Sequence, residues 1–410
     1  MKILMITPHF YPEQFQINEI ATELVKRGNE VAVLCGMPNY PKGEYFEGYE
    51  SLEACRERDK EYELATGVKV IRAFEVARGR NLTRLLRNYW SFAKNTERSV
   101  NDLQGDFDLV LGYQLSPVTS MAAAVKYKRA HNVPLVYYVL DLWPVSAAAM
   151  LKGKKNPLYP VVGWISRKIY KEADRLLVTS RPFVDYLSDV NGVSIEKMHY
   201  LPQHAGDEMI DMDLTAVDNG VTDFMFAGNF GKGQRLDVVV NAAAELGRRD
   251  DYKIHMVGDG SMREELEKMV REKGLQDNFI FYGNQRRGDM PEFYKKADVL
   301  LITLRGNNEV GNTMPGKLQM YMTTGKPIIG AINGAAQEVI RDAACGECVA
   351  AGDHHGLSKL MIKYIENPSL YTDSSAGQNA RAYFKANFTL DKFMDGLCRE
   401  LEDVKNSKRE

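Results

Sequence analysis

The sequence predicts two α/β domains, each built around a doubly wound parallel sheet. Short apolar runs typical of buried strands alternate with helical patterns along the chain, and this alternation starts again near Phe224. At 410 residues the chain is also too long for one ordinary hydrophobic core. Two such domains facing each other would form a cleft between the carboxyl ends of their strands.

The first half begins with a strand pattern at Lys2–Ile6, followed by apolar residues at helical spacing from Ile17 to Val25. Gly28 ends that helix. Further strands are predicted at Glu30–Leu34, Val68–Ala73, Leu109–Gly112, Leu135–Leu140 and Arg175–Thr179.

The second half repeats this alternation after a polar, acidic stretch, Ile210–Thr222, that has no clear periodicity and is predicted to be a linker. The last helical patterns run from about Ser374 to Asn406. Strands are predicted at Phe224–Ala227, Lys253–Val257, Phe279–Tyr282, Val299–Thr303, Pro327–Gly330 and Cys348–Ala350.

Composition narrows the class of protein. A hydrophobic content of 44% with 26% charged residues is typical of a soluble globular protein, and the net charge of −2 argues against nucleic acid as a partner. No apolar run approaches the roughly 18 residues that span a bilayer, and the first apolar run is too short for a signal peptide. Five dispersed cysteines fit a reducing compartment, so we expect a cytoplasmic address. For the lone Cys345-x-x-Cys348 motif, packing is favoured over zinc binding or redox chemistry.

Three loops of the second half each follow a strand and precede a helix: Gly228–Arg235, Val257–Met262 and Glu309–Lys317. Backbone N–H groups and the positive dipole end at a helix start suit phosphate, and Lys232 and Arg235 add positive charge. Each loop alone could be a solvated turn, but three at one sheet edge favour a diphosphate. None matches the Walker A or GxGxxG pattern, which argues against a kinase or a dehydrogenase.

Six segments together resemble a known family. They read PHFYPEQFQINEIATELVKRGNEVAVL with GMPNYPKGEY, YYVLDLWPVS, ADRLLVTSRPFVDYL, FMFAGNFGKGQRLDVVV, VGDGSMREELE and MPGKLQMYMTTGKPIIGAINGAAQEVI. The chain resembles the family 4 glycosyltransferases of the GT-B fold, in the bacterial subgroup that builds O-antigen, capsule and related polysaccharides. The resemblance implies an acceptor-binding domain over residues 1–205 and a nucleotide-sugar-binding domain over 206–385. A final helix over 386–410 would cross back to the first domain.

The resemblance also implies which residues bind the donor. As the sugar departs, the leaving nucleoside diphosphate gains negative charge, which cations and N–H dipoles stabilise. The predicted donor contacts are Gly228, Asn229, Lys232, Gln234, Gly258, Asp259, Asn312, Thr313, Met314 and Lys317. Retaining members need no metal, and the sequence has no convincing Asp-x-Asp at the end of a strand, since Asp211-Met212-Asp213 lies in the predicted linker. We therefore expect neither a metal nor a cofactor.

The chain departs from the family at its carboxylates. The wider family carries a Glu-x7-Glu pair where this chain has Asn312 and Met320, so Glu309 is the substitute carboxylate. Glu309 and Asn312 are predicted to recognise the donor sugar between them. Many members have His-Asp where this chain has Leu140-Asp141. Asp141 could orient the acceptor or the sugar, or it could be an ordinary turn residue.

The acceptor is expected at two loops of the first domain. Relatives often carry two glycines where this chain has Phe15 and Gln16, and these bulkier residues should narrow the approach of the acceptor. Asn18, at the next helix start, is the best polar candidate there. Asn39 and Tyr40 belong to a second candidate acceptor surface.

A basic, amphipathic segment lies between Arg72 and Arg98, with seven cations against two glutamates. Arg80, Arg84, Arg87 and Trp90 are predicted to face an anionic membrane. The alternative is a helix that packs on its own domain and has a solvated basic face. Family members commonly elongate a sugar on a polyprenyl diphosphate, which such a surface would also attract.

These observations predict a retaining glycosyltransferase that uses a nucleotide-sugar, most plausibly UDP-linked, and a lipid-linked saccharide acceptor. It would work in the cytoplasm, peripherally at the inner face of the plasma membrane. Two alternatives remain open: a non-hydrolysing nucleotide-sugar 2-epimerase, and a non-catalytic nucleotide-sugar-binding relative that has lost the carboxylates.

Overall fold

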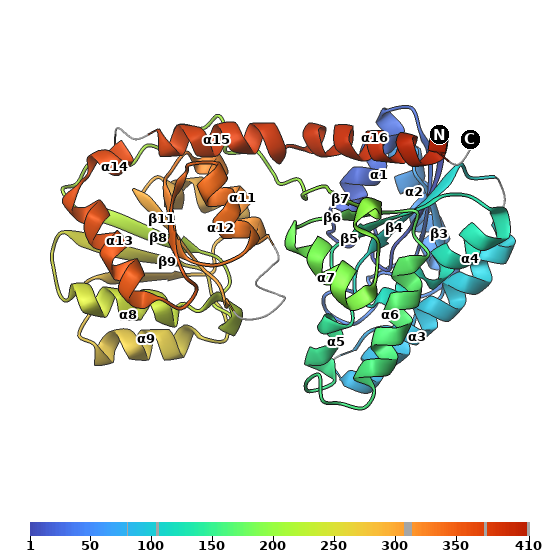
Figure 1. Cartoon of the computed structure of the whole chain (residues 1–410), viewed down its shortest axis with the longest axis horizontal. Helices are drawn as coiled ribbons and strands as arrows, with labels where there is room; N and C mark the ends of the chain where they lie inside the picture. The colour runs from blue at the N-terminus through green and yellow to red at the C-terminus, as the bar shows by residue number, and fades with distance from the viewer. Residues whose placement is uncertain (80, 104–105, 307–313, 373–374, 408–410) are drawn as a thin grey trace. The chain divides into compact units, whose positions relative to one another are not determined.

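The computed structural model describes residues 1–79, 81–103, 106–306, 314–372 and 375–407, and it divides into two compact units (Figure 1). Unit 1 comprises Met1–Leu201 with Met394–Glu410, and unit 2 comprises Pro202–Phe393. Each unit contains one sheet in which every strand pair is parallel. The predicted fold class, two doubly wound α/β domains, is confirmed.

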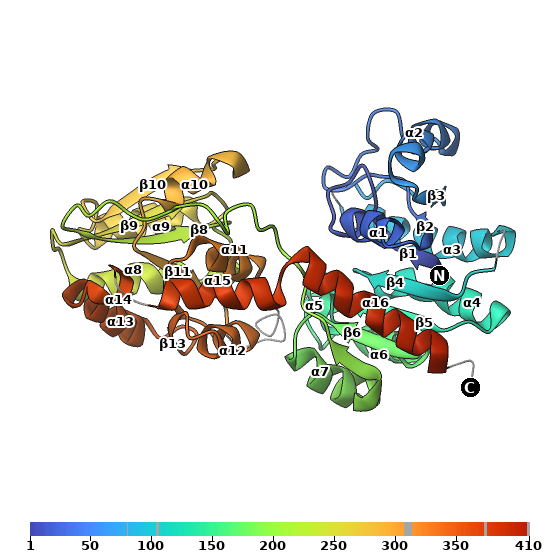
Figure 2. The ribbon, with the colours of Figure 1, turned by 90° about the horizontal axis from the view of Figure 1, so that it is seen from above.

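The sheet of unit 1 has seven strands in the order β3-β2-β1-β4-β5-β6-β7, and Figure 2 shows the first six in this succession. Chain order reverses between β1 and β4, which is the switch point where ligands of such sheets bind. The strands are β1 (Lys2–Ile6), β2 (Glu30–Cys35), β3 (Lys69–Arg72), β4 (Leu109–Gln114), β5 (Leu135–Val139), β6 (Arg175–Val178) and β7 (Met198–Tyr200). The sequence analysis missed β7, a strand of three residues that is too short to show a period.

The helices of unit 1 pack on this sheet and on one another. Helix α3 packs against α4, and both α3 and α6 contact the short 3-10 helix η2 (Val118–Met121). The helices are α1 (Ile17–Lys26), α2 (Leu52–Thr66), α3 (Leu82–Ser99), α4 (Ala122–His131), α5 (Val145–Met150), α6 (Tyr159–Lys171) and α7 (Pro182–Asn191).

The last helix, α16 (Leu390–Ser407), lies from Met394 onward on unit 1 (Figure 1). Leu397 and Leu401 are buried, and ionic contacts flank them. Asp395 Oδ1 accepts from Arg27 Nη1 at 2.6 Å, and Lys405 Nζ donates to Asp108 Oδ2 at 2.9 Å. The sequence analysis put the start of this final element at residue 386, whereas the units divide between Phe393 and Met394.

The sheet of unit 2 has six strands in the order β10-β9-β8-β11-β12-β13. Along β8, Phe224 and Phe226 belong to one apolar cluster, and Met225 and Ala227 belong to another. Both faces are therefore covered, as expected for a parallel sheet. The strands are β8 (Thr222–Ala227), β9 (Tyr252–Val257), β10 (Phe279–Gly283), β11 (Val299–Thr303), β12 (Ile328–Ala331) and β13 (Gly346–Val349).

Eight α-helices of unit 2 lie within the described ranges and flank this sheet. Helix α8 packs against α13, and α11 packs against α15. They are α8 (Asp237–Leu246), α9 (Arg263–Glu272), α10 (Met290–Tyr294), α11 (Gly316–Thr324), α12 (Ala335–Asp342), α13 (His354–Glu366), α14 (Ser369–Thr372) and α15 (Ala376–Asn387).

The predicted linker is wrong, because the chain leaves unit 1 at Leu201 and segment 210–222 is part of unit 2. Ile210 and Leu214 are buried in one of that unit's apolar clusters. Arg381 Nη2 donates to the carbonyl of Met212 at 2.7 Å. The segment looked like a linker because it has few apolar residues and no period, yet those few residues dock into the core.

Candidate functional site

A pocket of about 580 Å³ lies in unit 2 beside the loops that follow β8, β9 and β10 and the first turn of α11. Parallel strands place these loops at one edge of the sheet. Five of the predicted donor contacts line it together: Gly228, Asn229, Gly258, Asp259 and Lys317. Asn284, Gln285, Met290, Tyr294 and Met320 also line it. Apart from Met320, these were not expected to lie near the donor, because no sequence pattern marks them.

The first two loops touch each other through their backbones. Phe230 N donates to Asp259 O at 2.8 Å, and Met262 N donates to Phe230 O at 2.9 Å. At Gly258, whose φ is +132°, an added Cβ would lie 1.9 Å from the carbonyl oxygen of Gly228. Only glycine permits this approach of the two loops. Gly258 is therefore needed for packing, and it also lets a ligand come close to the backbone.

Lys317 is a half-buried cation of the pocket. Its Nζ donates to Gln234 Oε1 and lies 3.8 Å from the centroid of the Phe226 ring. Burial lowers the pKa of this amine to about 7. Among the described residues no carboxylate forms an ion pair with it, so a bound anion would be its first full counter-charge.

The other predicted donor contacts are placed differently. Lys232 is exposed on the 3-10 helix η4 (Lys232–Gln234) and does not line the pocket, while Gln234 reaches it through Lys317. Met314 packs against an apolar cluster. Asp259 accepts hydrogen bonds from Gly260 N at 2.7 Å and from Arg263 Nη1 at 3.0 Å, and both lower the pKa of its carboxyl. Glu309, Asn312 and Thr313 lie outside the described residues, as does Arg80 of the predicted membrane face.

In unit 1, Asp141 follows β5 and is held by the backbone. Its Oδ2 accepts from Ser116 N at 2.9 Å, and its carbonyl accepts from the hydroxyl of Tyr170 at 3.0 Å. Trp143 Nε1 donates to Ser116 Oγ at 3.1 Å. Asp141 thus joins the loops after β4 and β5. This contact is the role of an ordinary turn residue, the alternative to orienting the acceptor or the sugar.

Glu13, which the sequence analysis did not single out, organises the predicted acceptor loops. It is 1% exposed, and its Oε1 accepts from the backbone N–H groups of Asn39 and Tyr40 at 2.7 and 2.6 Å. Its Oε2 lies 2.7 Å from Nδ1 of His9. Because carboxylate oxygens accept, His9 donates from Nδ1 to Glu13. A lone glutamate in a loop has no sequence signature, so only the structure could find it.

The predicted acceptor residues divide into two kinds. The ring of Phe15 stacks on His9 with centroids 4.8 Å apart, and the ring of Tyr40 lies 5.4 Å from that of Phe15. Asn18 and Asn39 instead hold the backbone: Asn18 Nδ2 donates to Glu13 O, and Asn39 Oδ1 accepts from Arg78 N. Gln16 precedes the first turn of α1. The aromatic residues therefore form the surface that a ligand could meet.

Two features bear on metal binding. Cys345 and Cys348 are free thiols, and burial raises the pKa of each to about 12, as expected for packing residues. Among the described residues, Glu245, His354 and His355 bring ligand atoms within 4.8 Å of one another, on α8 and α13. None of these three residues lines the pocket.

Comparison with known families decides what kind of protein this is. A model described as "Glycosyl transferase 4-like domain" matches residues 14–204, and one described as "Glycosyl transferases group 1" matches residues 212–383. The chain belongs to glycosyltransferase family 4. It is an enzyme of this class, as the resemblance of its motifs implied.

One relative of this glycosyltransferase is WcaI of Escherichia coli (strain K12), whose name describes a colanic acid biosynthesis glycosyl transferase. It is 26% identical over 354 residues, which is 79% of this chain and 82% of WcaI.

Solved structures show the same GT-B fold. The Anabaena protein Alr3699/HepE, crystallised with UDP, has a TM-score of 0.67 at 14% identity, over 98% of this chain and all of HepE. The lipopolysaccharide outer core galactosyltransferase WaaB has a TM-score of 0.67 at 15% identity over the full length of both chains. Across the described parts of the glycosyltransferase, no helix combines the length and apolarity needed to cross a membrane.

Gly258→Ala is expected to lower the free energy of unfolding by about 2–4 kcal/mol, because the new methyl group would collide with the Gly228 carbonyl at a strained φ. Gly233→Ala is the matched control. It lies in the same loop region with no atom within 4 Å of the added Cβ, and should change stability by less than about 1 kcal/mol. Urea denaturation measures both. Equal stability of the two variants would show that the loop contact does not constrain the fold.

Proposed function

We propose that this enzyme is a retaining glycosyltransferase that moves a sugar from a UDP-linked donor to a lipid-linked saccharide. The pocket of unit 2 is the observation that supports this most strongly. It combines two glycine loops, a helix start and the half-buried Lys317, which has no carboxylate partner among the described residues. HepE, which shares the fold, was crystallised with UDP, and the name of WcaI describes a glycosyl transferase of colanic acid biosynthesis.

The chemistry follows from the charges. As the bond between the sugar and the diphosphate breaks, negative charge grows on the leaving UDP. The Lys317 ammonium and the first turn of α11 stabilise that charge in a site with little water. The acceptor hydroxyl attacks the anomeric carbon, and the leaving diphosphate takes its proton. Retention, and the absence of a metal from this step, follow from the family resemblance.

On the donor sugar we assign recognition to Glu309 and Asn312, with Asp141 orienting the acceptor or the sugar. These roles rest on the positions of the residues in the family motif. On the acceptor side, the faces of Phe15 and Tyr40 suit the apolar face of a saccharide ring. The His9 ring, which stacks on Phe15 and contacts Glu13 through Nδ1, belongs to the same surface.

The donor class is tested by incubating the enzyme with UDP-, GDP- and ADP-sugars while recording the melting temperature and the products. UDP-sugars are expected to raise the melting temperature by mass action and to be slowly hydrolysed to UDP. Glu309→Ala and Asn312→Ala should each reduce this turnover. Interconversion of the sugar would instead establish an epimerase. Binding without turnover would indicate a non-catalytic relative. A response to GDP- or ADP-sugars alone would show that the donor carries a different base.

Lys317→Met is expected to weaken UDP binding at pH 7 at least about tenfold, because a charge-assisted contact is lost. The wild-type affinity should fall between pH 7 and 9 as the amine, with a pKa of about 7, loses its proton. Titration calorimetry at several pH values measures this, and the affinity of the variant should stay flat. Lys232→Met, which removes an exposed cation outside the pocket, is the control. A larger effect at Lys232 would contradict the assignment.

The same lysine gives a stability signature. The folded pKa of about 7 lies below the ordinary 10.5, so the unfolded chain binds more protons between these values. The cost of burying the amine is complete below pH 7 and disappears as the pH rises to about 10.5. The unliganded Lys317→Met variant should therefore melt higher than wild type at pH 7, and this advantage should shrink towards pH 10.

Membrane association is tested with liposomes. Arg84 and Arg87 are exposed on α3, and the Arg84→Glu/Arg87→Glu variant is expected to lose most of its binding to anionic vesicles at low salt. The control, Arg271→Glu/Lys273→Glu, makes the same charge change at exposed positions of unit 2. Sedimentation measures the bound fraction. Failure of the wild-type enzyme to bind at low salt would exclude the membrane surface as a partner.

A further inference from the structure

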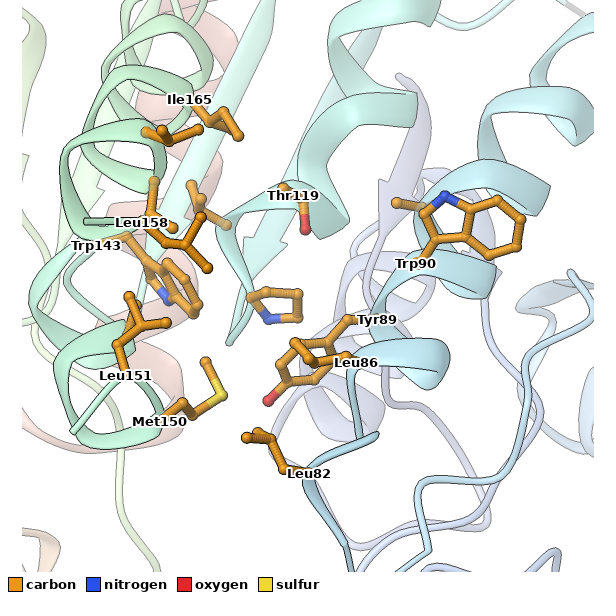
Figure 3. Close-up of a pocket in the computed structure, with 16 residues that line it drawn as sticks. Leu82, Leu86, Tyr89, Trp90, Thr119, Trp143, Met150, Leu151, Leu158 and Ile165 are labelled. Carbon is orange, nitrogen blue, oxygen red and sulfur yellow. The ribbon is translucent and has the colours of Figure 1, made fainter. Parts of the chain in front are cut away.

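An apolar groove of about 430 Å³ lies in unit 1 between α3 on one side and α5 and α6 on the other, with η2 between them. Figure 3 shows Leu82, Leu86 and Tyr89 along one wall, and Trp143, Leu151 and Leu158 along the other. Of the sixteen lining residues, only Thr119 has a side chain that is neither apolar nor aromatic. The volume lies within the range of ligand pockets.

Helix α3 buries its polar side and exposes its apolar side, which is the reverse of an ordinary surface helix. Its buried side is largely polar: Asn88 donates to Glu75 Oε1 and to Val76 O, and Ser91 Oγ accepts from Val76 N. Its apolar side is exposed, with Leu86 at 53% and Trp90 at 62%. Large side chains arranged in this way expose an apolar surface that folding alone does not explain.

Cations and tryptophans border the groove. The Lys94 ammonium lies 4.3 Å from the Trp90 ring on α3, and the Lys168 ammonium lies 3.8 Å from the Trp164 ring on α6. Trp164 is 55% exposed. Tryptophan beside lysine is typical of a surface that meets lipid head groups, where the ring is half in hydrocarbon and the charge contacts phosphate. An apolar groove with a basic border fits a lipid that has an anionic head.

Arg78 lies between the groove and the candidate acceptor surface. Tyr89 lines the groove, and the Arg78 guanidinium lies 6.0 Å from its ring centroid. The same guanidinium lies 5.5 Å from the ring of Tyr40, which belongs to the acceptor surface. On the other wall, Trp143 Nε1 donates a hydrogen bond to Ser116 Oγ, and the backbone N–H of Ser116 donates to Asp141 Oδ2. A molecule that fills the groove would therefore have its head at Arg78.

We propose that this groove binds the hydrocarbon chain of the lipid-linked acceptor, and that Arg78 binds the phosphate that joins the chain to the saccharide. The inference rests on the proposed function and adds to it the subsite for the lipid. The occupant is the chain of the acceptor, because Arg78 contacts both Tyr89 of the groove and Tyr40 of the candidate acceptor surface.

The test uses the three tryptophans of the chain, which all lie on or beside the groove and report on it through their intrinsic fluorescence. Titration with farnesyl diphosphate should change the fluorescence and give a Kd at least tenfold below that of geranyl diphosphate, since each buried methylene strengthens binding about fourfold. Inorganic diphosphate should give no change. Equal affinities for the two prenyl diphosphates would overturn the proposal.

Variants locate the site. Leu86→Asp/Val161→Asp places charges at two exposed groove positions and should reduce farnesyl diphosphate affinity at least tenfold. Leu64→Asp/Ile195→Asp makes the same change at exposed positions outside the groove and should leave the affinity unchanged. Arg78→Met should weaken farnesyl diphosphate but not farnesol. Unchanged affinity in the first variant, or fluorescence that responds to phosphatidylglycerol vesicles but not to farnesyl diphosphate, would overturn the proposal.

These outcomes are separable from failure of the proposed function. UDP-dependent changes in melting temperature are measured in the same variants and report on unit 2. Farnesyl diphosphate binding without any response to UDP-sugars would leave the lipid subsite standing and refute the donor assignment. The reverse result would refute the lipid subsite alone.

Discussion

Parallel strand order is the constraint on which both candidate sites depend. It brings loops that are distant in the sequence to one edge of each sheet, where their backbones must pass within contact distance. In unit 2 this contact is direct: the turns at Gly228 and Gly258 leave no room for a side chain between them. The pocket lies beside these two turns, and Lys317 of α11 also lines it.

In unit 1 a side chain, not a backbone contact, holds the neighbouring loops together. The carboxylate of Glu13 accepts hydrogen bonds from the backbone N–H groups of Asn39 and Tyr40, so the loop after β1 fixes the loop after β2. Glu75, a second buried carboxyl group, has its pKa raised by burial and by the nearby charge of Glu13. It contacts Asn88, and so connects these loops to α3. The acceptor surface and the groove are therefore parts of one hydrogen-bonded framework.

The sequence predicted what depends on period and on chain order. Apolar runs located twelve of the thirteen strands of the described chain, and the loop pattern predicted the convergence that the pocket around Gly228, Gly258 and Lys317 displays. It could not predict features set by tertiary contacts. Lys232 stays a predicted donor contact from the family resemblance, but its exposed place on η4, outside the pocket lining, has no sequence signal. Segment 210–222 resembled a linker because its docking residues are few and aperiodic.

Helix α3 shows the same limit in another form. Its pattern predicts an amphipathic helix but not which side is buried, because that choice depends on what the neighbouring backbone needs. The N–H and carbonyl groups of Val76 lie beside α3 and require polar partners, which Ser91 and Asn88 supply. The apolar side is left outward as a consequence, and the sequence left this orientation open beside that of a helix packed on its own domain.

The two sites share one energetic feature. Lys317 is a half-buried amine whose lowered pKa records a cost to folding, and the outward leucines and Trp90 of α3 leave apolar surface in water. Neither feature stabilises the unit that contains it. Proteins retain such local violations where a ligand removes the cost, an anion for the amine and a hydrocarbon chain for the exposed surface. In the reaction we propose, the unfavourable charge in unit 2 would meet the diphosphate that leaves, and the unfavourable apolar face in unit 1 would meet the lipid that carries the acceptor saccharide.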